Sequence, residues 1–400
     1  MDLRTAIVHS EFVVTGGIER VPLLQTLYLR RRGVETDCYA TAINPRTCHP
    51  SIVTQVAPRS ILPRIGKPIL GIRALNHVLA VALCRLSPRR LRGYEVLQAH
   101  YQPAPWICYF AHKKYGTPYT HYAHGICREL YPRGIDIETV QEKSLPRYVL
   151  RKLRFWLDLD RESVGEAALC FANSRYTGEQ MKEIYKVTNI SVLYPGVDTQ
   201  CFRPMATTET KPVVEKYGIQ SPFVLTSNKH IGYKRIEWLI EMMPLILSEV
   251  PQISLVVVGS FNPAYTPRLL ETRARLNLED KVSFLRCVDD YDLAALYNCA
   301  SVYAFSPPDE DFGLGPVEAM CCGTPPVAWD AGGPRETIIC GENGLLARPY
   351  DRQDFASKCL KVITDPSFRS KLSSGALAAR TRFSWEAHVS QLIQDLFRLM

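Results

Sequence analysis

The chain has 400 residues, 46% of them hydrophobic and 22% charged, which is ordinary for a globular protein, and this length suggests two domains. No apolar run reaches about 18 residues, so we expect no transmembrane helix. The first residues lack the regions of a signal peptide, so we expect a cytoplasmic protein. Positive charge is concentrated in residues 1–200, which hold 27 Lys/Arg against 17 Asp/Glu, whereas residues 201–400 hold 21 against 23.

Strands and helices alternate in the first half of the chain. An apolar run at 5–9 is followed by Thr15-Gly16-Gly17 and by apolar residues spaced three and four apart from Ile18 to Tyr28. This pattern predicts a strand, a glycine loop and a helix. Alternation of this kind predicts a parallel sheet with helices on both faces. Further strands are predicted at 34–40, 94–99, 118–123 and 168–172.

A second alternation follows residues 194–204, a segment with two prolines and a glycine that we interpret as the interdomain linker. Residues 385–400 form an amphipathic pattern that predicts a last helix. We therefore expect a first domain over 1–195, a second over 205–380 and a final helix over 384–400. Strands of the second domain are predicted at 222–228, 253–259, 281–285, 301–305 and 325–329.

Residues 59–92 are basic and apolar together. Such a segment could lie on an anionic membrane surface as a peripheral contact. Pro63 and Pro68 interrupt the apolar run, so a core helix with a solvated basic face is the alternative. We expect no nucleic-acid partner.

The segment 307–337 has the most informative pattern of chemistry. Glu310 and Glu318 flank Gly313-Leu314-Gly315, and Pro316 suits the first position of a helix that stops at Gly323. A glycine turn that exposes backbone N–H groups at a helix N-terminus suits a diphosphate. Glu310 could then accept hydrogen bonds from sugar hydroxyls, and Glu318, expected in the first helical turn, could reach a ribose.

This segment resembles the E-x7-E signature of the retaining glycosyltransferases of family 4. The flanking Glu-Ala-Met at 318–320, Gly-Thr-Pro at 323–325 and Gly332-Gly333 with Glu336 match it in the same order. The resemblance implies an α/β chain of the GT-B fold, in which two Rossmann-like doubly wound domains face each other across a cleft. The chain is most similar to the mannosyltransferase branch of this family. The resemblance also implies that the last helix crosses back onto the first domain.

The resemblance extends to other positions. Lys229 and Lys234 stand where the family places an Arg and a Lys on the donor diphosphate, and the lysine at 229 would make a point-charge contact in place of a bidentate one. Gly16 and Gly17 correspond to the glycine loop after the first strand. His124, directly after the strand at 118–123, matches a histidine near the transferred sugar, whereas His121 is interpreted as structural.

The resemblance implies a reaction without cofactor or metal, in which a hexose moves to a glycan or lipid-linked acceptor. GDP-mannose is expected in preference to a UDP-sugar, and a front-face or a covalent mechanism both stay open. Asp158 and Asp160 are expected on a helix surface and not at a cation.

A nucleotide-sugar epimerase or a phosphorylase of the same fold and a non-catalytic adaptor at a membrane surface are the alternatives. The candidate catalytic residues are His124 and Glu310, and the candidate donor-binding residues are Gly16, Gly17, Lys229, Lys234, Phe312, Gly313, Leu314, Gly315 and Glu318.

Overall fold

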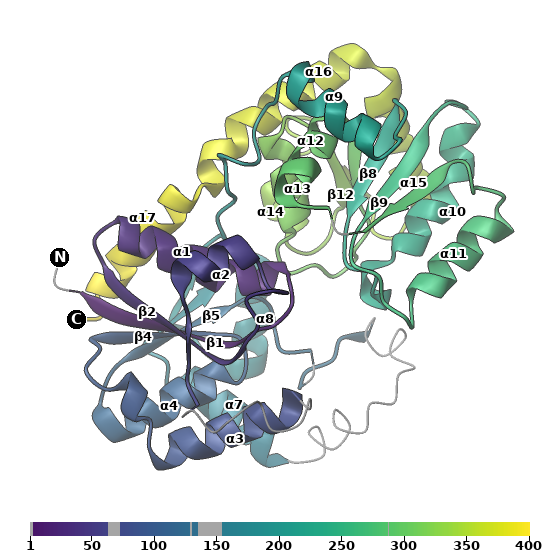
Figure 1. Cartoon of the computed structure of the whole chain (residues 1–400). Helices are drawn as coiled ribbons and strands as arrows, with labels where there is room; N and C mark the ends of the chain where they lie inside the picture. The colour runs from purple at the N-terminus through teal and green to yellow at the C-terminus, as the bar shows by residue number, and fades with distance from the viewer. Residues whose placement is uncertain (1–2, 63–72, 129, 135–153, 287) are drawn as a thin grey trace. The chain divides into compact units, whose positions relative to one another are not determined.

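The computed structural model describes residues 3–62, 73–128, 130–134, 154–286 and 288–400. The chain divides into two compact units. The first comprises Met1–Arg133, Gln141–Gly196 and Trp385–Met400, and the second comprises Gly134–Val140 and Val197–Ser384. Each unit is built on one parallel sheet with helices on both faces (Figure 1), which is the doubly wound arrangement that the alternating pattern predicts.

The first unit holds a sheet of seven parallel strands in the order β3-β2-β1-β4-β5-β6-β7. Its central strands β4 and β5 are buried along their whole length, as expected for a sheet that is covered on both faces. The strands are β1 Arg4–Phe12, β2 Glu35–Ile43, β3 Arg59–Ser60, β4 Val96–His100, β5 Tyr119–Ala123, β6 Leu169–Ala172 and β7 Ile190–Val192.

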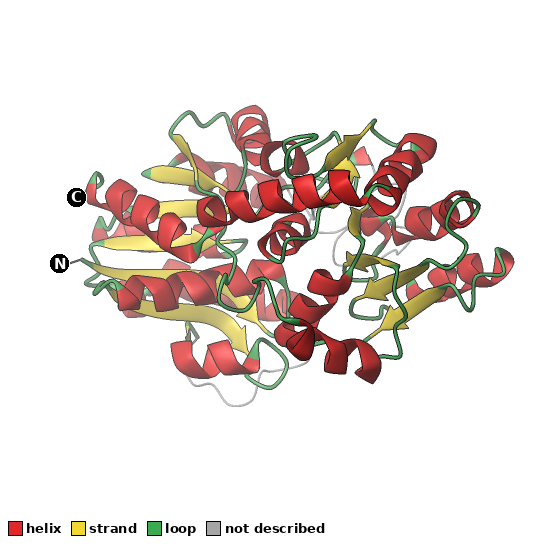
Figure 2. Cartoon of the chain, turned by 90° about the horizontal axis from the view of Figure 1, so that it is seen from above, coloured by secondary structure: helices red, strands yellow, loops and turns green. Residues whose placement is uncertain are grey.

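Two hydrophobic clusters cover the two faces of this sheet. One face packs against α1 Gly17–Arg31, α2 Pro50–Val56 and α17 Trp385–Phe397. The chain therefore returns to the first unit at its end, where α17 packs on this face of the sheet and contacts α1. Both helices are labelled in Figure 1, and Figure 2 marks the C-terminus that follows α17. The other face packs against α3 Arg73–Leu86, α4 Ala104–Tyr115, α7 Arg154–Gly165 and α8 Arg175–Tyr185, and η1 spans Arg89–Leu91.

The second unit holds six parallel strands in the order β10-β9-β8-β11-β12-β13. Helices α10, α11 and α15 cover one face, and α12, α13 and α14 lie on the other (Figure 1). The strands are β8 Phe223–Ser227, β9 Ser254–Val258, β10 Val282–Leu285, β11 Val302–Phe305, β12 Pro326–Trp329 and β13 Leu345–Ala347. The helices are α9 Thr207–Lys216, η2 Gly232–Lys234, α10 Ile236–Leu247, α11 Thr266–Arg275, α12 Asp290–Cys299, α13 Leu314–Cys321, α14 Pro334–Thr337, α15 Arg352–Thr364, α16 Pro366–Ala378 and η3 Ala379–Phe383.

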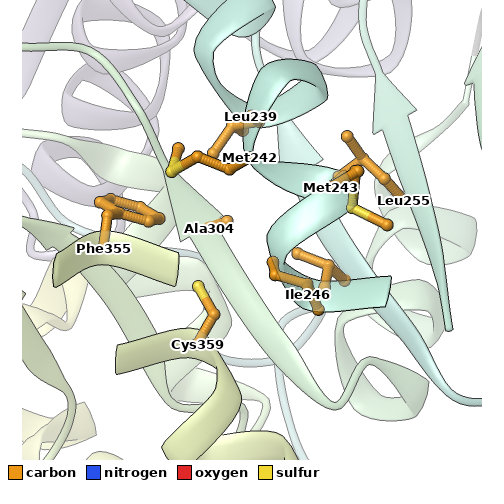
Figure 3. A pocket seen from close by; sticks show the side chains of 9 residues that line it. Leu239, Met242, Met243, Ile246, Leu255, Ala304, Phe355 and Cys359 are labelled. Atoms are coloured by element: carbon orange, nitrogen blue, oxygen red, sulfur yellow. The ribbon is translucent and has the colours of Figure 1, made fainter. Parts of the chain in front are cut away.

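A small cavity lies inside the core of the second unit, between α10, α15 and the sheet (Figure 3). Because every residue around it is apolar or a buried thiol, this space reflects packing and offers a charged ligand no partner. The residues that line it are Val224, Leu239, Met242, Met243, Ile246, Leu255, Ala304, Phe355 and Cys359.

The expectation that Asp160 lies on a helix surface is wrong. Asp158 is exposed, but Asp160 is fully buried in α7. Its Oδ1 accepts hydrogen bonds from Gln102 Nε2 at 3.0 Å and Trp106 Nε1 at 2.8 Å, and its Oδ2 accepts one from the Tyr185 hydroxyl at 2.9 Å. Residues two apart point to opposite sides of a helix, which is why Asp158 is exposed and Asp160 is buried. Through its three hydrogen bonds, the Asp160 carboxylate joins α7 to α8 and to the start of α4.

None of the helices in the described part of the chain combines the length and the apolar character needed to cross a membrane. Within the basic and apolar stretch 59–92, residues 63–72 lie outside the described residues, and the remainder contains α3 and η1. Leu86, at the end of α3, is 73% exposed. The peripheral membrane contact stays a prediction.

Burial of His121 in β5 gives a test of this packing. The side chain is 2% exposed, and desolvation lowers its pKa to about 4. An unfolded histidine titrates near pH 6.5. Between that pH and 4 the unfolded chain therefore takes up a proton that the folded chain does not, and the first unit loses stability as the pH falls. We expect the loss between pH 7.5 and 5.0 to be about 2 kcal/mol smaller in His121→Phe than in the unmodified protein.

This difference is measured by urea unfolding at the two pH values, with hydrogen exchange of peptides from β4 and β5 as the probe of the first unit. An equal pH dependence in the two proteins would show that the imidazole of His121 does not stay neutral in the folded unit.

Candidate functional site

The sequence-predicted residues of the second unit meet at the switch point of its sheet. Strand β8 pairs with β9 on one side and with β11 on the other, so the loops that follow β8 and β11 leave the same edge in opposite directions. Ligands of doubly wound sheets bind at this point, outside the carboxyl ends of the strands. Lys229 and Lys234 lie in the loop after β8, and Glu310 and Gly313 lie in the loop after β11.

An ion pair between Lys234 Nζ and Glu310 Oε2 joins these two loops. The two side chains are only 15% and 20% exposed. The carbonyl of Lys234 accepts a hydrogen bond from Ser306 Oγ at 2.9 Å, and the carbonyl of Ser306 accepts one from Trp329 Nε1 at 2.8 Å. These hydrogen bonds fasten the backbone at Lys234 to Ser306, the residue that follows β11, and fasten Ser306 to β12.

The turn from Phe312 to Gly315 leads into α13 and depends on its glycines. Gly313 has a φ of +86° and caps the helix, a backbone conformation that glycine adopts without strain. A Cβ at Gly315 would lie 2.2 Å from the Tyr303 hydroxyl. The Phe312 side chain is 3% exposed and packs edge-on against Phe383, so it anchors the turn. The first N–H groups of a helix lack partners within the helix, which makes this terminus suited to an anion.

Gly332 and Gly333 pack against the backbone of the same turn. A Cβ at Gly333 would lie 2.4 Å from the carbonyl oxygen of Asp311 and 2.5 Å from Cα of Phe312. The amide of Gly333 donates a hydrogen bond to the carbonyl of Glu310 at 2.9 Å. The Gly332-Gly333 pair, which matches the family pattern in the sequence, therefore supports the loop that carries Glu310.

Glu318 lies in the second turn of α13, because the helix begins at Leu314 and not at Pro316 as predicted. The earlier start follows from Gly313, whose left-handed conformation caps the helix before the proline. The Glu318 side chain is 8% exposed, and its Oε2 accepts a hydrogen bond from the Tyr297 hydroxyl at 3.2 Å. The carboxylate is thereby fixed beneath the turn.

A hydroxyl cluster beneath the turn was missed by sequence analysis. Ser227 Oγ lies 2.7 Å from the Tyr297 hydroxyl and 3.0 Å from the Tyr303 hydroxyl. Burial raises the pKa of both tyrosines, so the phenols stay protonated and can donate. The three residues come from β8, α12 and β11, and no local motif in the sequence links them.

Lys229 has a different environment from Lys234. The side chain of Lys229 is exposed. Its neighbours are anchored: the amide of Asn228 donates to the carbonyl of Val258 at 2.9 Å, and the buried ring of His230 stacks on Phe261. Burial lowers the pKa of His230 to about 4, so a neutral imidazole fixes the loop and Lys229 projects from a rigid base.

In the first unit, the sequence-predicted residues also follow the carboxyl ends of strands. Gly16 is the N-cap of α1 and Gly17 its first residue, after β1. Nε2 of His49 lies 3.3 Å from the amide nitrogen and 3.0 Å from the carbonyl oxygen of Gly16, which fastens the glycine loop to the segment after β2.

His124 follows β5 directly. Its Nε2 lies 3.1 Å from His100 Nδ1, and its carbonyl accepts a hydrogen bond from Asn173 Nδ2 at 2.8 Å. Burial, and to a lesser extent the neighbouring His9, lowers the pKa of His124 well below its ordinary value. His124 is therefore a neutral imidazole near pH 7, able to donate one hydrogen bond and accept another.

Among the described residues, no group of three or more His, Cys, Asp or Glu side chains is arranged to hold a metal ion. The polar groups at the switch point of the second unit are the Lys234 ammonium, the carboxylates of Glu310 and Glu318, hydroxyls and the backbone amides that begin α13. These groups suit a phosphorylated ligand that also carries hydroxyls.

Two family models match the chain. "Glycosyltransferase Family 4" matches residues 15–200, and "Glycosyl transferases group 1" matches residues 209–378. Among curated proteins, the D-inositol 3-phosphate glycosyltransferase of Stackebrandtia nassauensis is 27% identical over 94% of this chain and 86% of its own length. That of Mycolicibacterium smegmatis is 25% identical over 96% and 87%. These relatives do not reproduce the narrower resemblance to mannosyltransferases.

Solved structures share the fold over nearly the whole chain. Anabaena HepE, solved in complex with UDP-glucose, superposes with a TM-score of 0.77 at 22% identity and covers 98% of this chain and 99% of its own. Sucrose-phosphate synthase from Thermosynechococcus elongatus gives a TM-score of 0.77 at 22% identity over 99% and 100%. Together the family models, the relatives and the fold replace the epimerase, phosphorylase and adaptor alternatives: the chain belongs to glycosyltransferase family 4 and is a retaining hexosyltransferase of the GT-B fold that takes its sugar from a nucleotide sugar.

Proposed function

We propose that this enzyme transfers a hexose from a UDP-hexose to a hydroxyl of a polyol or glycan acceptor, without a metal, and that it binds the donor diphosphate at the switch point of the second sheet. The observation that carries the proposal is the ion pair between Lys234 and Glu310, which joins the β8 and β11 loops beside the N-terminus of α13.

The groups at this point divide between phosphate and hydroxyls. Lys234 and the amides that begin α13 attract a diphosphate. Before the donor binds, Glu310 neutralises Lys234. When the diphosphate shares the ammonium, the Glu310 carboxylate can accept hydrogen bonds from hydroxyls of the transferred sugar. Glu318, oriented by the Tyr297 hydroxyl, can do the same for the ribose hydroxyls.

The reaction breaks the bond between the sugar C1 and the diphosphate oxygen and forms a bond from C1 to the acceptor oxygen on the same face. The proton of the acceptor hydroxyl passes to the departing phosphate oxygen, so no separate base is needed. Lys234, Lys229 and the turn amides stabilise the charge that develops on the leaving group. His124, neutral because of its burial, contributes a hydrogen bond to the sugar.

The choice of donor departs from the expected GDP-mannose. HepE has been solved with UDP and with UDP-glucose, which supports a uridine nucleotide. The relatives named for D-inositol 3-phosphate support a polyol phosphate as one acceptor class, beside the glycan or lipid-linked acceptor that the sequence favours. A lipid-linked acceptor would give the basic segment 59–92 a reason to contact a membrane surface.

A donor panel tests the proposal. We expect UDP-glucose or another UDP-hexose to bind in calorimetry and to be turned over in the presence of EDTA. GDP-mannose should bind at least about tenfold more weakly, because a site that pairs its polar groups with uracil leaves them unpaired against guanine. Inositol 3-phosphate and short glycans serve as acceptors, with products identified by mass spectrometry. Turnover of GDP-mannose alone would contradict a UDP-hexose donor and favour the GDP-mannose that the sequence predicts. Dependence on a divalent cation would contradict the metal-free chemistry.

Three variants of the second unit separate the assigned roles within the same panel. Lys234→Met should lower kcat/KM by about 10²–10³-fold through lost charge stabilisation, Glu318→Gln should mainly weaken donor binding, and Glu310→Gln should mainly lower kcat. Lys211→Met is the matched control, since Lys211 forms an exposed ion pair with Glu215 in the same unit. Equal activity of the three variants and the Lys211→Met control would show that the donor does not bind at this switch point.

Gly333→Ala tests the support of the donor turn. The new Cβ would meet backbone atoms of Asp311 and Phe312 at 2.4–2.5 Å, so the turn must shift or the unit must lose about 1–3 kcal/mol of stability. We expect donor affinity to fall at least about tenfold, measured by calorimetry beside thermal unfolding. Gly165→Ala is the control, because the new Cβ would meet nothing within 4 Å beyond the neighbouring backbone of its own helix. Donor binding and stability that both match the control would show that the turn does not depend on Gly333.

A further inference from the structure

A line of buried polar side chains runs through the first unit to His124. Gln25 lies on α1, and Gln98 and His100 lie on β4. The two glutamines are each 1% exposed and His100 is fully buried. Gln25 Nε2 lies 2.7 Å from Gln98 Oε1 and 3.3 Å from His100 Nε2, and His100 Nδ1 lies 3.1 Å from His124 Nε2. Each link is within reach of a hydrogen bond.

The direction of this line is set at its far end. The hydroxyl of Thr5 donates to the carbonyl of Val96 at 2.8 Å, and a carbonyl can only accept. The Thr5 oxygen is then the acceptor for Gln98 Nε2 at 2.9 Å. This turns the Gln98 oxygen toward Gln25, so Gln25 must present its amide nitrogen to Gln98 and, with its second proton, to His100 Nε2.

The two histidines follow from that polarity. Because His100 Nε2 accepts, a neutral His100 carries its proton on Nδ1 and donates it to His124 Nε2. His124 in turn carries its own proton on Nδ1. We infer that Gln25 is a positioning residue, which acts through His100 to hold His124 in the Nδ1–H tautomer.

His388 on α17 favours the opposite orientation of Gln25. Its Nε2 lies 3.1 Å from Gln25 Oε1 and its Nδ1 lies 2.7 Å from the carbonyl of Tyr194, so a neutral His388 can donate to only one of the two oxygens. Turning the Gln25 amide would satisfy His388, but it would set two amide oxygens against each other at the 2.7 Å contact with Gln98. The shorter contact and the anchor at Thr5 decide for the Nδ1–H tautomer.

This inference deepens the proposed function and rests on it in one respect, the role of His124 at the sugar. With Nε2 engaged by His100, His124 offers the substrate an N–H donor at Nδ1 and cannot act as a base through Nε2. The tautomer itself depends only on the side chains of the first unit.

Histidine-selective ¹⁵N labelling and long-range ¹H–¹⁵N spectra report which ring nitrogen carries the proton, and the spectrum of His124→Gln assigns the His124 signals. We expect Nδ1 of His124 to be the protonated nitrogen in the unmodified protein. Gln25→Glu places an acceptor-only carboxylate beside His100 and should invert both tautomers, so that His124 carries its proton on Nε2. Thr26→Val, which removes a buried hydrogen bond to the carbonyl of Pro22 on the same helix, should leave the His124 signals unchanged.

The kinetic arm separates the two ideas. We expect Gln25→Glu to lower kcat about tenfold or more with less than about a threefold change in KM for the UDP-hexose, and to have no further effect in a His124→Gln background. A proton on Nε2 of His124 in the unmodified protein would overturn the inference whatever the activity. So would an unchanged His124 tautomer in a folded Gln25→Glu protein whose His100, read in the same spectra, carries a single proton. An inverted tautomer with unchanged kcat would keep the inference and overturn the role proposed for His124.

Discussion

The ion pair between Lys234 and Glu310 is the interaction on which the second unit's candidate site depends. It connects the loop after β8 to the loop after β11 at the one place where the sheet reverses its winding. Gly332 and Gly333 support the Glu310 side, and Ser306 and Trp329 hold the Lys234 side. A pair that is largely shielded from water contributes little net stability after its desolvation, so its value lies in placing two opposite charges for a ligand that needs both.

Much of this arrangement could be predicted from the sequence because it rests on local chemistry. The strands and helices of both sheets follow from their apolar periodicity, and the turn before α13 follows from glycines that only a tight backbone requires. Lys234, Glu310 and Glu318 were placed through their spacing and the family resemblance. Short strands such as β3, β7 and β13 escaped prediction, since two or three residues carry too little pattern to be distinguished from a loop.

The remainder depends on contacts between distant parts of the chain. Asp160 was expected on a surface, yet it is buried because Gln102, Trp106 and Tyr185 supply three donors from other segments. The cluster of Ser227, Tyr297 and Tyr303 and the line from Gln25 to His124 likewise join side chains that no motif links. In the second unit the hydroxyl cluster supports the groups at the switch point, and in the first unit the line of polar side chains leads to His124. Contacts of this kind join distant segments, so local patterns in the sequence do not predict them.

A crystal structure of the protein with UDP-glucose is the most direct measurement of the central claim. We expect the diphosphate oxygens to lie within hydrogen-bonding distance of Lys234 Nζ and of the backbone amides of the turn at 313–315, with the Glu318 carboxylate on the ribose hydroxyls. A nucleotide bound elsewhere in the chain, or one whose diphosphate contacts neither Lys234 nor the turn, would contradict it.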